Sequence, residues 1–259
     1  MATLYIAEEH DQVFHYWRRT QAKGLSVAHV DFHCDLRGML IDRQRQRAFS
    51  VSAAERRYVD PGNFLGHAVM EGMVSELDWI HAPHGGRRFD DGPVVKYETD
   101  LAAKLPRTLQ MLRPQPEYDI KFKELLLQNW AGPRHGQQLD LDWDALASRE
   151  FTQAESDRLI TQFLNLPFAH PPAVSFLVYS PDYAIEDRAA FQNFGHTLAA
   201  KLGAELQELP AMPAATPAAV TGLKQRLKQF APSQLKAAKR RLSTRWRDYE
   251  TRHDLPIHS

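Results

Sequence analysis

The chain has 259 residues, of which 43% are hydrophobic and 25% charged, a composition typical of a globular protein large enough to bury its own core. Lysine and arginine together number 32, as do aspartate and glutamate, so the charge favours neither nucleic acid nor a membrane surface as a partner. A single cysteine, Cys34, excludes an internal disulfide framework and fits a reducing cytoplasm. No apolar run approaches the roughly 20 residues of a membrane span, and the N-terminus lacks the pattern of a signal peptide. We therefore expect a soluble, cytoplasmic protein.

Short apolar runs alternate with helical patterns along the chain, and this order predicts an α/β fold with a mostly parallel sheet. Strands are predicted over residues 3–7, 25–32, 77–81, 138–142 and 173–179. Helical spacing of apolar residues predicts helices over residues 11–23, 63–74, 99–112, 153–164 and 187–202. Residues 119–127 fit a strand and a helix equally. Thr152 and Glu155 have the spacing of a capping box, which predicts a helix that begins at Gln153.

The end of the chain differs in composition from the rest. Residues 209–219 are rich in proline and alanine and are predicted to form a linker, whereas residues 220–259 are basic and helical in pattern. The main domain is therefore predicted over residues 1–208. The basic segment is interpreted either as a solvated helical arm, which could also join copies into a homo-oligomer, or as a docking surface for an acidic peptide or protein.

Residues with the chemistry of metal ligands occur at the end of the predicted strand over residues 25–32. Side chains two residues apart on an extended chain point to the same side, so Asp31, His33 and Asp35 are predicted to converge at the carboxyl end of this strand. Open α/β sheets place their functional sites at that edge. Carboxylate oxygens and an imidazole nitrogen suit manganese, zinc or iron. The alternative is that all three are exposed turn residues.

A second acidic motif lies on the predicted strand over residues 138–142. Asp140 and Asp142 share one face of this strand, and Asp144 either continues that line or caps the next element. Carboxylates packed together repel one another unless cations lie between them. Two divalent cations would cancel four aspartates, and a pair of metal ions can activate a bridging hydroxide and polarise a substrate. Together the two motifs predict a two-metal hydrolase.

A histidine also follows the first predicted strand. The carboxyl ends of parallel strands share one edge of the sheet, so His10 could supply a further nitrogen ligand to the same site. From the residues alone, the alternative of a purely structural histidine stays open.

These motifs resemble a known group of proteins. Asp31-x-His33-x-Asp35 followed by Asp140-x-Asp142 resembles the two metal motifs of the arginase/deacetylase superfamily. A narrower resemblance, to the UPF0489 family, covers about residues 4–200 and leaves the basic C-terminal segment outside it. The motifs that carry it are Glu8-Glu9-His10, Val30 to Leu36, Asn63-Phe64-Leu65, Trp79 to Pro83, Leu139 to Asp142 and Ser180-Pro181-Asp182-Tyr183.

The resemblance implies a three-layer α/β/α fold that holds two Mn²⁺ ions. The ligands that it implies are His10, Asp31, Asp35 and Asp140 for one ion, with His33 and Asp142 completing the other. Proteins similar to the UPF0489 family include peptide arginases, which convert arginine side chains of ribosomally made peptides to ornithine and release urea. The resemblance therefore implies an arginase-like metallohydrolase whose partner is an arginine-containing peptide, with or without a leader segment.

Several residues outside the metal motifs are candidates for catalysis or substrate binding. His67 and His84 are candidate proton shuttles to the departing amine, and the alternative for each is a histidine without a catalytic role. Glu186 could anchor the guanidinium through a bidentate pair, or it could be a solvated acid at a helix start. Tyr183 is predicted either to line the pocket or to pack beside it, and Asn63 is a candidate substrate ligand.

The residues after the first metal motif differ from those of arginases that act on free arginine. Leu36 and Arg37 stand where such arginases carry small polar residues, which favours an arginine presented on a longer chain. Two other functions stay open: a deacetylase or amidohydrolase that uses one zinc ion, and a non-catalytic peptide-binding module. Cys34 is interpreted as a small buried filler, with a metal-binding or regulatory thiol as the alternative.

Overall fold

The structure is a computed structural model that describes residues 2–50, 58–82, 117–185 and 187–209. All of these residues belong to one compact unit, Met1–Ala211. The predicted helix over residues 99–112, the candidates His84 and Glu186, and the chain beyond Leu209 lie outside the described residues. Within the described ranges, no helix combines the length and the apolar character that crossing a membrane would require.

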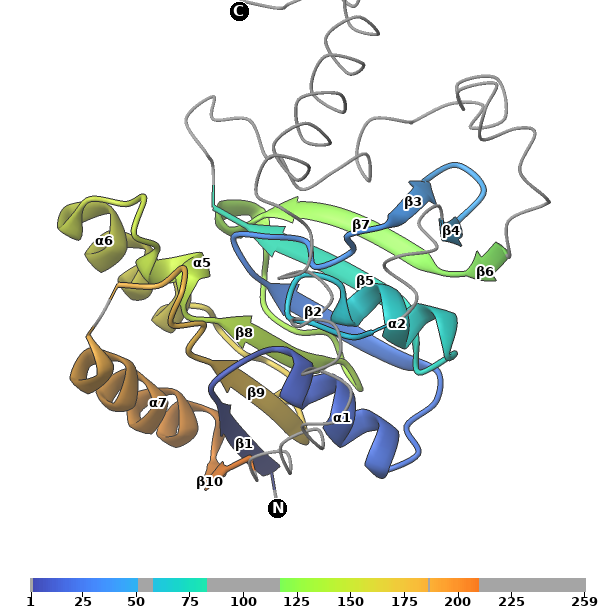
Figure 1. The fold of residues 1–259 in the computed structure, drawn as a ribbon. Coiled ribbons are helices and arrows are strands. Elements are labelled where there is room, and N and C mark those ends of the chain that lie inside the picture. Colours follow the sequence, from blue (N-terminus) through green and yellow to red (C-terminus); the bar gives the residue numbers. More distant parts are fainter. Residues whose placement is uncertain (1, 51–57, 83–116, 186, 210–259) are drawn as a thin grey trace, which may run out of the picture. The chain divides into compact units, whose positions relative to one another are not determined.

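Seven strands form one parallel sheet. In chain order they are β1 (Ala2–Ala7), β2 (Leu25–Val30), β5 (Val74–His81), β7 (Lys121–Leu126), β8 (Gln138–Asp142), β9 (Val174–Val178) and β10 (Ala204–Glu208). Their order across the sheet is β10-β1-β9-β8-β2-β5-β7, and every neighbouring pair is parallel (Figure 1). A small antiparallel sheet stands beside it, built from β3 (Met39–Asp42), β4 (Arg47–Ser50) and β6 (Glu117–Asp119).

Helices cover both faces of the parallel sheet. Along β9, Leu177 packs in one hydrophobic cluster, whereas its neighbours Phe176 and Val178 pack in another, because successive side chains of a strand point to opposite faces. The first cluster includes residues of α5 (Asp144–Ala147), α6 (Gln153–Leu164) and α7 (Arg188–Leu202), and the second includes residues of α1 (Asp11–Arg19) and α2 (Phe64–Met70). This confirms the predicted three-layer α/β/α fold.

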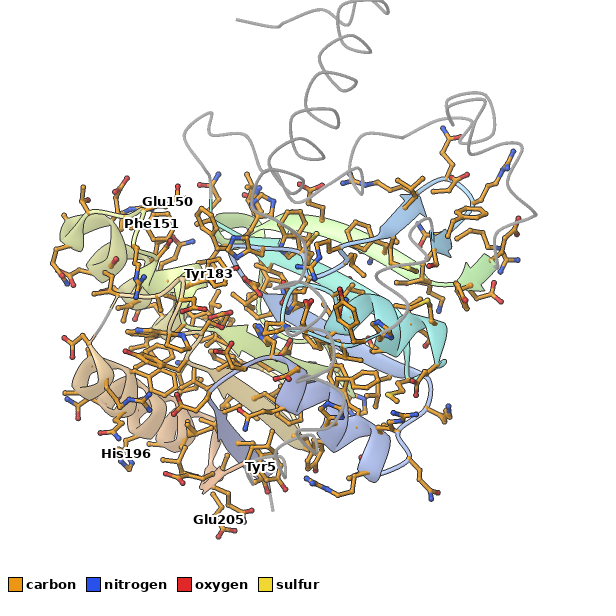
Figure 2. The ribbon with its side chains drawn as sticks, in the orientation of Figure 1. Tyr5, Glu150, Phe151, Tyr183, His196 and Glu205 are labelled. Carbon is orange, nitrogen blue, oxygen red and sulfur yellow. The ribbon has the colours of Figure 1, made fainter. Side chains whose placement is uncertain are left out.

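The helices follow from the placement of their apolar residues. In α7, Phe191, Phe194 and Leu198 are buried at helical spacing, and His196 points outward, as Figure 2 shows. The predicted capping box starts α6: the Thr152 hydroxyl accepts the Glu155 N–H at 3.3 Å, and the Glu155 carboxylate accepts the Thr152 N–H at 2.7 Å. The helix predicted over residues 153–164 and the strand predicted over residues 138–142 are both confirmed with the same bounds.

Two sequence-based predictions about the chain near the first metal motif need correction. The predicted strand over residues 25–32 ends at Val30, because Asp31 Oδ1 accepts the N–H of His33 at 2.7 Å and turns the chain. Asp35 has φ 50°, so the motif is a loop, not an extended chain.

The predicted helix over residues 63–74 is shorter than expected: α2 ends at Met70, and the chain enters β5 at Val74. Residues 121–126 of the ambiguous segment form a strand.

Candidate metal centre

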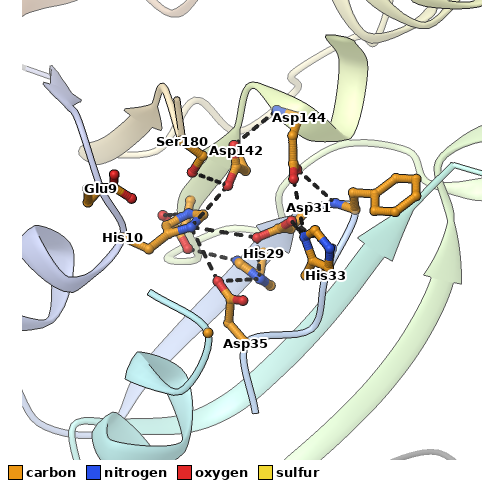
Figure 3. A network of polar contacts seen from close by, with 12 residues as sticks. Glu9, His10, His29, Asp31, His33, Asp35, Asp142, Asp144 and Ser180 are labelled. Carbon is orange, nitrogen blue, oxygen red and sulfur yellow. Dashed lines mark hydrogen bonds and ion pairs between the residues drawn. The ribbon is translucent and has the colours of Figure 1, made fainter. Parts of the chain in front are cut away.

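The site lies at the carboxyl ends of four strands that are neighbours in the sheet, β1-β9-β8-β2. This edge is where open parallel sheets place functional groups. The strands and the loops that follow them contribute His10 after β1, Ser180 after β9, Asp140, Asp142 and Asp144 from β8 and its end, and His29, Asp31, His33 and Asp35 from β2 and its end (Figure 3). The topology thus brings together residues that are more than a hundred positions apart in the chain.

His10 lies at the centre of the first group of polar side chains. Its Nδ1 is 3.2 Å from Asp35 Oδ2 and 3.2 Å from Asp142 Oδ2, and its Nε2 is 3.5 Å from Asp140 Oδ1. His10 is 1% exposed, and Phe64 stacks on its ring at 4.9 Å between centroids. His10, His29 and Asp31 each offer one ligand atom, and these atoms lie within 4.8 Å of one another. The group could hold a cation.

A second group contains Asp31, His33 and Asp144. His33 Nδ1 lies 3.2 Å from Asp144 Oδ2 and 3.9 Å from Asp31 Oδ1. The other Asp144 oxygen accepts the N–H of Phe32 at 3.3 Å, which fixes the carboxylate beside the loop. The Asp31 carboxylate belongs to both groups.

Several pKa values in the centre are shifted, because its carboxylates are buried close to one another. Burial raises the pKa of Asp31 well above its ordinary value, and the charges of Asp144 and Asp35 add to this. Burial, together with the Asp142 charge, likewise raises the pKa of Asp144. Burial by itself would lower the pKa of His10, but the Asp140 and Asp142 carboxylates raise it well above its ordinary value. Asp31 and Asp144 therefore bind protons more readily than ordinary aspartates do.

The side chains of the centre fit divalent cations. Among the described residues, several buried atoms have no hydrogen-bond partner: His10 Nε2, His29 Nε2, Asp31 Oδ2, Asp140 Oδ1 and Asp144 Oδ2. A buried polar atom without a partner costs roughly 1–3 kcal/mol, so five of them in one place indicate a missing counterpart. Nitrogen and oxygen atoms bound to one metal ion at about 2.1 Å lie about 3–4 Å from one another. The nitrogen–oxygen distances given above for His10 and His33 have this size.

Ser180 holds one of the proposed ligands in place. Its hydroxyl donates to Asp142 Oδ2 at 2.6 Å, while Asp142 Oδ1 accepts the N–H of Asp144 at 3.0 Å. Ser180 is 3% exposed and has φ 48°, a left-handed conformation that costs a non-glycine residue about 1–2 kcal/mol. A strained residue that donates a hydrogen bond into the centre indicates a positioning function.

We expect Ser180→Ala to weaken Mn²⁺ binding by about 10–100-fold, because Asp142 loses the donor that orients it. Ser180→Gly removes the same hydroxyl but adopts φ 48° without strain, so it should lose the same affinity while remaining at least as stable as the alanine variant. Calorimetric titration with Mn²⁺ and thermal unfolding of the metal-free proteins measure the two effects. Wild-type affinity in both variants would contradict the positioning function.

A cavity of about 230 Å³ opens onto the centre. Its walls are formed by His10, His33, Cys34, Asp35, Arg37, Pro61, Gly62, Asp142, Ser180 and Tyr183. Tyr183 lies beside His33, with 4.9 Å between the ring centroids. Arg37 pairs with Asp60, and a Cβ at Gly62 would come within 2.9 Å of the Arg37 Nη1, so a larger residue at this position would require the Arg37 side chain to shift.

Two residues predicted to act in substrate binding and proton transfer, Asn63 and His67, have contacts within the fold. Asn63 is 1% exposed and holds a turn: its Oδ1 accepts the N–H of Asp60 at 2.8 Å and its Nδ2 donates to the Tyr58 carbonyl at 3.1 Å. His67 is buried on α2 with its ring 6.0 Å from that of Phe14. Neither is among the residues that line this cavity, and their roles in substrate binding and proton transfer stay predictions. Cys34 is 2% exposed, as expected of a buried filler.

Sequence reasoning missed His29 and left Asp144 undecided. His29 stands two positions before Asp31, so the same alternation that grouped the motif residues could have included it. Asp144 is the first residue of α5 but does not cap it, because the N-cap is Trp143 and no side chain caps the helix; its carboxylate faces His33 instead.

The fold and the site define an α/β protein with a buried cluster of aspartates and histidines, suited to bind cations, at the carboxyl edge of a parallel sheet.

No protein-family model matches this sequence, and no curated protein matches it. Among solved structures, the chain is similar to the proclavaminate amidino hydrolase of Streptomyces clavuligerus, with 15% sequence identity and a TM-score of 0.40. The match covers 78% of this chain and 63% of that one, so the chain spans less than two thirds of that protein. A similarity of this strength carries no argument for an activity, and the resemblance to the UPF0489 family stays a prediction.

Proposed function

We propose that this protein is a metal-dependent hydrolase that cleaves the guanidino group of arginine, and more narrowly a manganese-dependent peptide arginase that converts peptidyl arginine to ornithine and urea. The observation that carries this proposal is the position of Asp31, whose carboxylate is shared by two groups of potential ligands. In two-metal sites the ions lie about 3.5–4 Å apart, a distance that one carboxylate can bridge.

The charge of the centre supports a cationic substrate. Five aspartates contact its histidines, namely Asp31, Asp35, Asp140, Asp142 and Asp144. Two divalent cations would cancel four of these negative charges, which leaves the centre with a residual negative charge. Asp35 and Asp142 line the cavity itself, so a guanidinium entering it would meet carboxylates with which its N–H groups can pair.

The chemistry requires a nucleophile, a place for its proton and a proton for the departing amine. A bound pair of metal ions would supply an activated water molecule and would polarise the substrate. Asp35 and Asp142 are the described carboxylates in the cavity wall, and they are placed to take up the proton of that water and to return it to the departing amine. Ser180 keeps Asp142 oriented, and the Tyr183 ring lines the cavity beside His33.

The size of the cavity supports a side chain as the reacting group. Pockets for drug-sized ligands have volumes of roughly 300–1,000 Å³, and this cavity measures about 230 Å³. It would admit the end of one arginine side chain, while the rest of a peptide lay outside.

The alternative of an amidohydrolase with a single metal ion is supported less well, because its reaction does not use the second group around His33 and Asp144.

A urea assay tests the proposal. The metal-free protein is reloaded with Mn²⁺ and incubated with peptides that contain arginine, with the same peptides carrying lysine in its place, and with free arginine. We expect urea from the arginine peptides, accompanied by loss of one CH₂N₂ unit in the mass spectrum. No urea from any arginine peptide by the loaded protein would overturn the proposal, and acetate released from acetyl-lysine peptides would favour the single-ion alternative.

A further inference from the structure

His29 lies among the aspartates of the centre and is 0% exposed. It belongs to β2, where its Cα stands directly opposite that of Asp140 in the parallel pairing with β8. Side chains opposite each other on neighbouring strands point to the same face. His29 Nδ1 accordingly lies 2.8 Å from Asp140 Oδ2, the shortest contact that the imidazole makes in the centre.

The other ring nitrogen faces more carboxylates. His29 Nε2 lies 3.1 Å from Asp31 Oδ2 and 3.9 Å from Asp35 Oδ2. Neither His29 Nε2 nor Asp31 Oδ2 has a hydrogen-bond partner among the described residues, and both are buried. The Phe64 ring stacks on His10 and meets the His29 ring edge-on, with 6.0 Å between the His29 and Phe64 centroids.

The geometry divides the roles of the two ring nitrogens. The 2.8 Å contact between Nδ1 and Asp140 Oδ2 has the length of a hydrogen bond to a carboxylate, so Asp140 can accept an N–H from Nδ1. Nε2 faces Asp31 Oδ2 at 3.1 Å. His10, His29 and Asp31 each offer one ligand atom within 4.8 Å of the other two, a separation that fits three ligands of one cation.

We propose that His29 is a ligand of the metal centre through Nε2, and that Asp140 orients it by accepting its Nδ1–H. The inference rests on the metal dependence in the proposed function, but it does not depend on which reaction follows. A metal-bound histidine commonly donates its second N–H to a carboxylate, and Asp140 occupies this position. His10 and His29 would then both offer nitrogen to the ion near Asp31 Oδ2.

Substitutions at His29 separate a ligand from a hydrogen-bond partner. His29→Asn keeps an amide nitrogen near the Nδ1 position, so it can still donate to Asp140, but it has no atom at Nε2. His29→Gln places its amide near Nε2 and loses the contact with Asp140. His196→Asn, on the exposed face of α7, is the matched control. Affinities for Zn²⁺ and Mn²⁺ are measured by competition with a chelating dye.

The asparagine variant is expected to lose more than about 100-fold in Zn²⁺ affinity, which exceeds the usual effect of an outer hydrogen-bond partner. The loss should be larger for Zn²⁺ than for Mn²⁺, because imidazole nitrogen suits zinc better. If His29 only donated a hydrogen bond, asparagine would preserve the affinity and glutamine would not. That outcome, or equal affinity in both variants and the wild type, overturns the proposal.

A second measurement needs no variant that might fold poorly. In the wild-type protein labelled with ¹⁵N-histidine, saturation with Zn²⁺ should change the nitrogen resonances of three imidazoles of the centre, those of His10, His29 and His33. Changes confined to two of them would overturn the ligand assignment. Three coordinated imidazoles without urea release would overturn the proposed hydrolysis and leave His29 as a ligand, so the two failures are distinguishable.

Discussion

Asp31→Asn is expected to lower kcat/KM for urea release by at least about 10³-fold, a loss of about 4 kcal/mol of transition-state stabilisation. Asp31 is the carboxylate common to both ligand groups, with its Oδ2 near His29 and its Oδ1 near His33. An asparagine has nearly the same shape but no charge and a single acceptor oxygen, so it cannot bridge two cations. The number of bound Mn²⁺ ions per chain should also fall below two.

The matched control for this variant is Asp157→Asn, which makes the same chemical change on the exposed face of α6. It should retain wild-type activity and metal content. Steady-state kinetics with an arginine peptide and metal analysis of the purified proteins give the two measurements. An Asp31→Asn protein that retains both activity and two bound ions would show that no shared carboxylate is needed.

Mn²⁺ at about a thousand times its dissociation constant is expected to stabilise the protein by about 4 kcal/mol at about pH 8, which corresponds to a rise in Tm of about 8–16 °C. The stabilisation should be several-fold smaller at about pH 5.5. Burial raises the pKa of Asp31 and of Asp144, so at acidic pH bound protons compete with the metal for these oxygens.

The metal-free protein should respond to pH in the opposite direction. Groups whose pKa is raised by folding, here Asp31, Asp144 and His10, stabilise the fold below their ordinary pKa, and this contribution is lost as pH rises through the raised value. For Asp140, burial would raise the pKa, but His10 and His29 lower it, so its contribution is lost only in strong acid.

Thermal unfolding of chelated and Mn²⁺-loaded protein across this pH range measures the difference. Mg²⁺ at the same concentration serves as the control for ionic strength, since it prefers all-oxygen, largely hydrated sites. A stabilisation that is independent of pH would mean that the ion binds away from these aspartates.

The sequence by itself predicted the layered fold and most of the acidic and histidine side chains that the structure brings together at the sheet edge. Alternation of apolar runs with helical patterns is a local property, so it predicted β8 and α6 to the residue. The aspartates of two short motifs share a chemistry that few other functions require, which pointed to one site at the sheet edge. The loop after Val30 differed from the prediction because a side chain, Asp31, turned the chain through a hydrogen bond.

Only the tertiary structure decided which side chains face each other. β2 and β8 are far apart in the chain, and their parallel register alone places His29 opposite Asp140. The contacts of Ser180 with Asp142 and of Asp144 with His33 likewise join separate strand ends. Periodicity within a segment reports on burial, but it holds no information on the order of strands in a sheet. That order is set by the packing of the whole core, and it completed the metal centre.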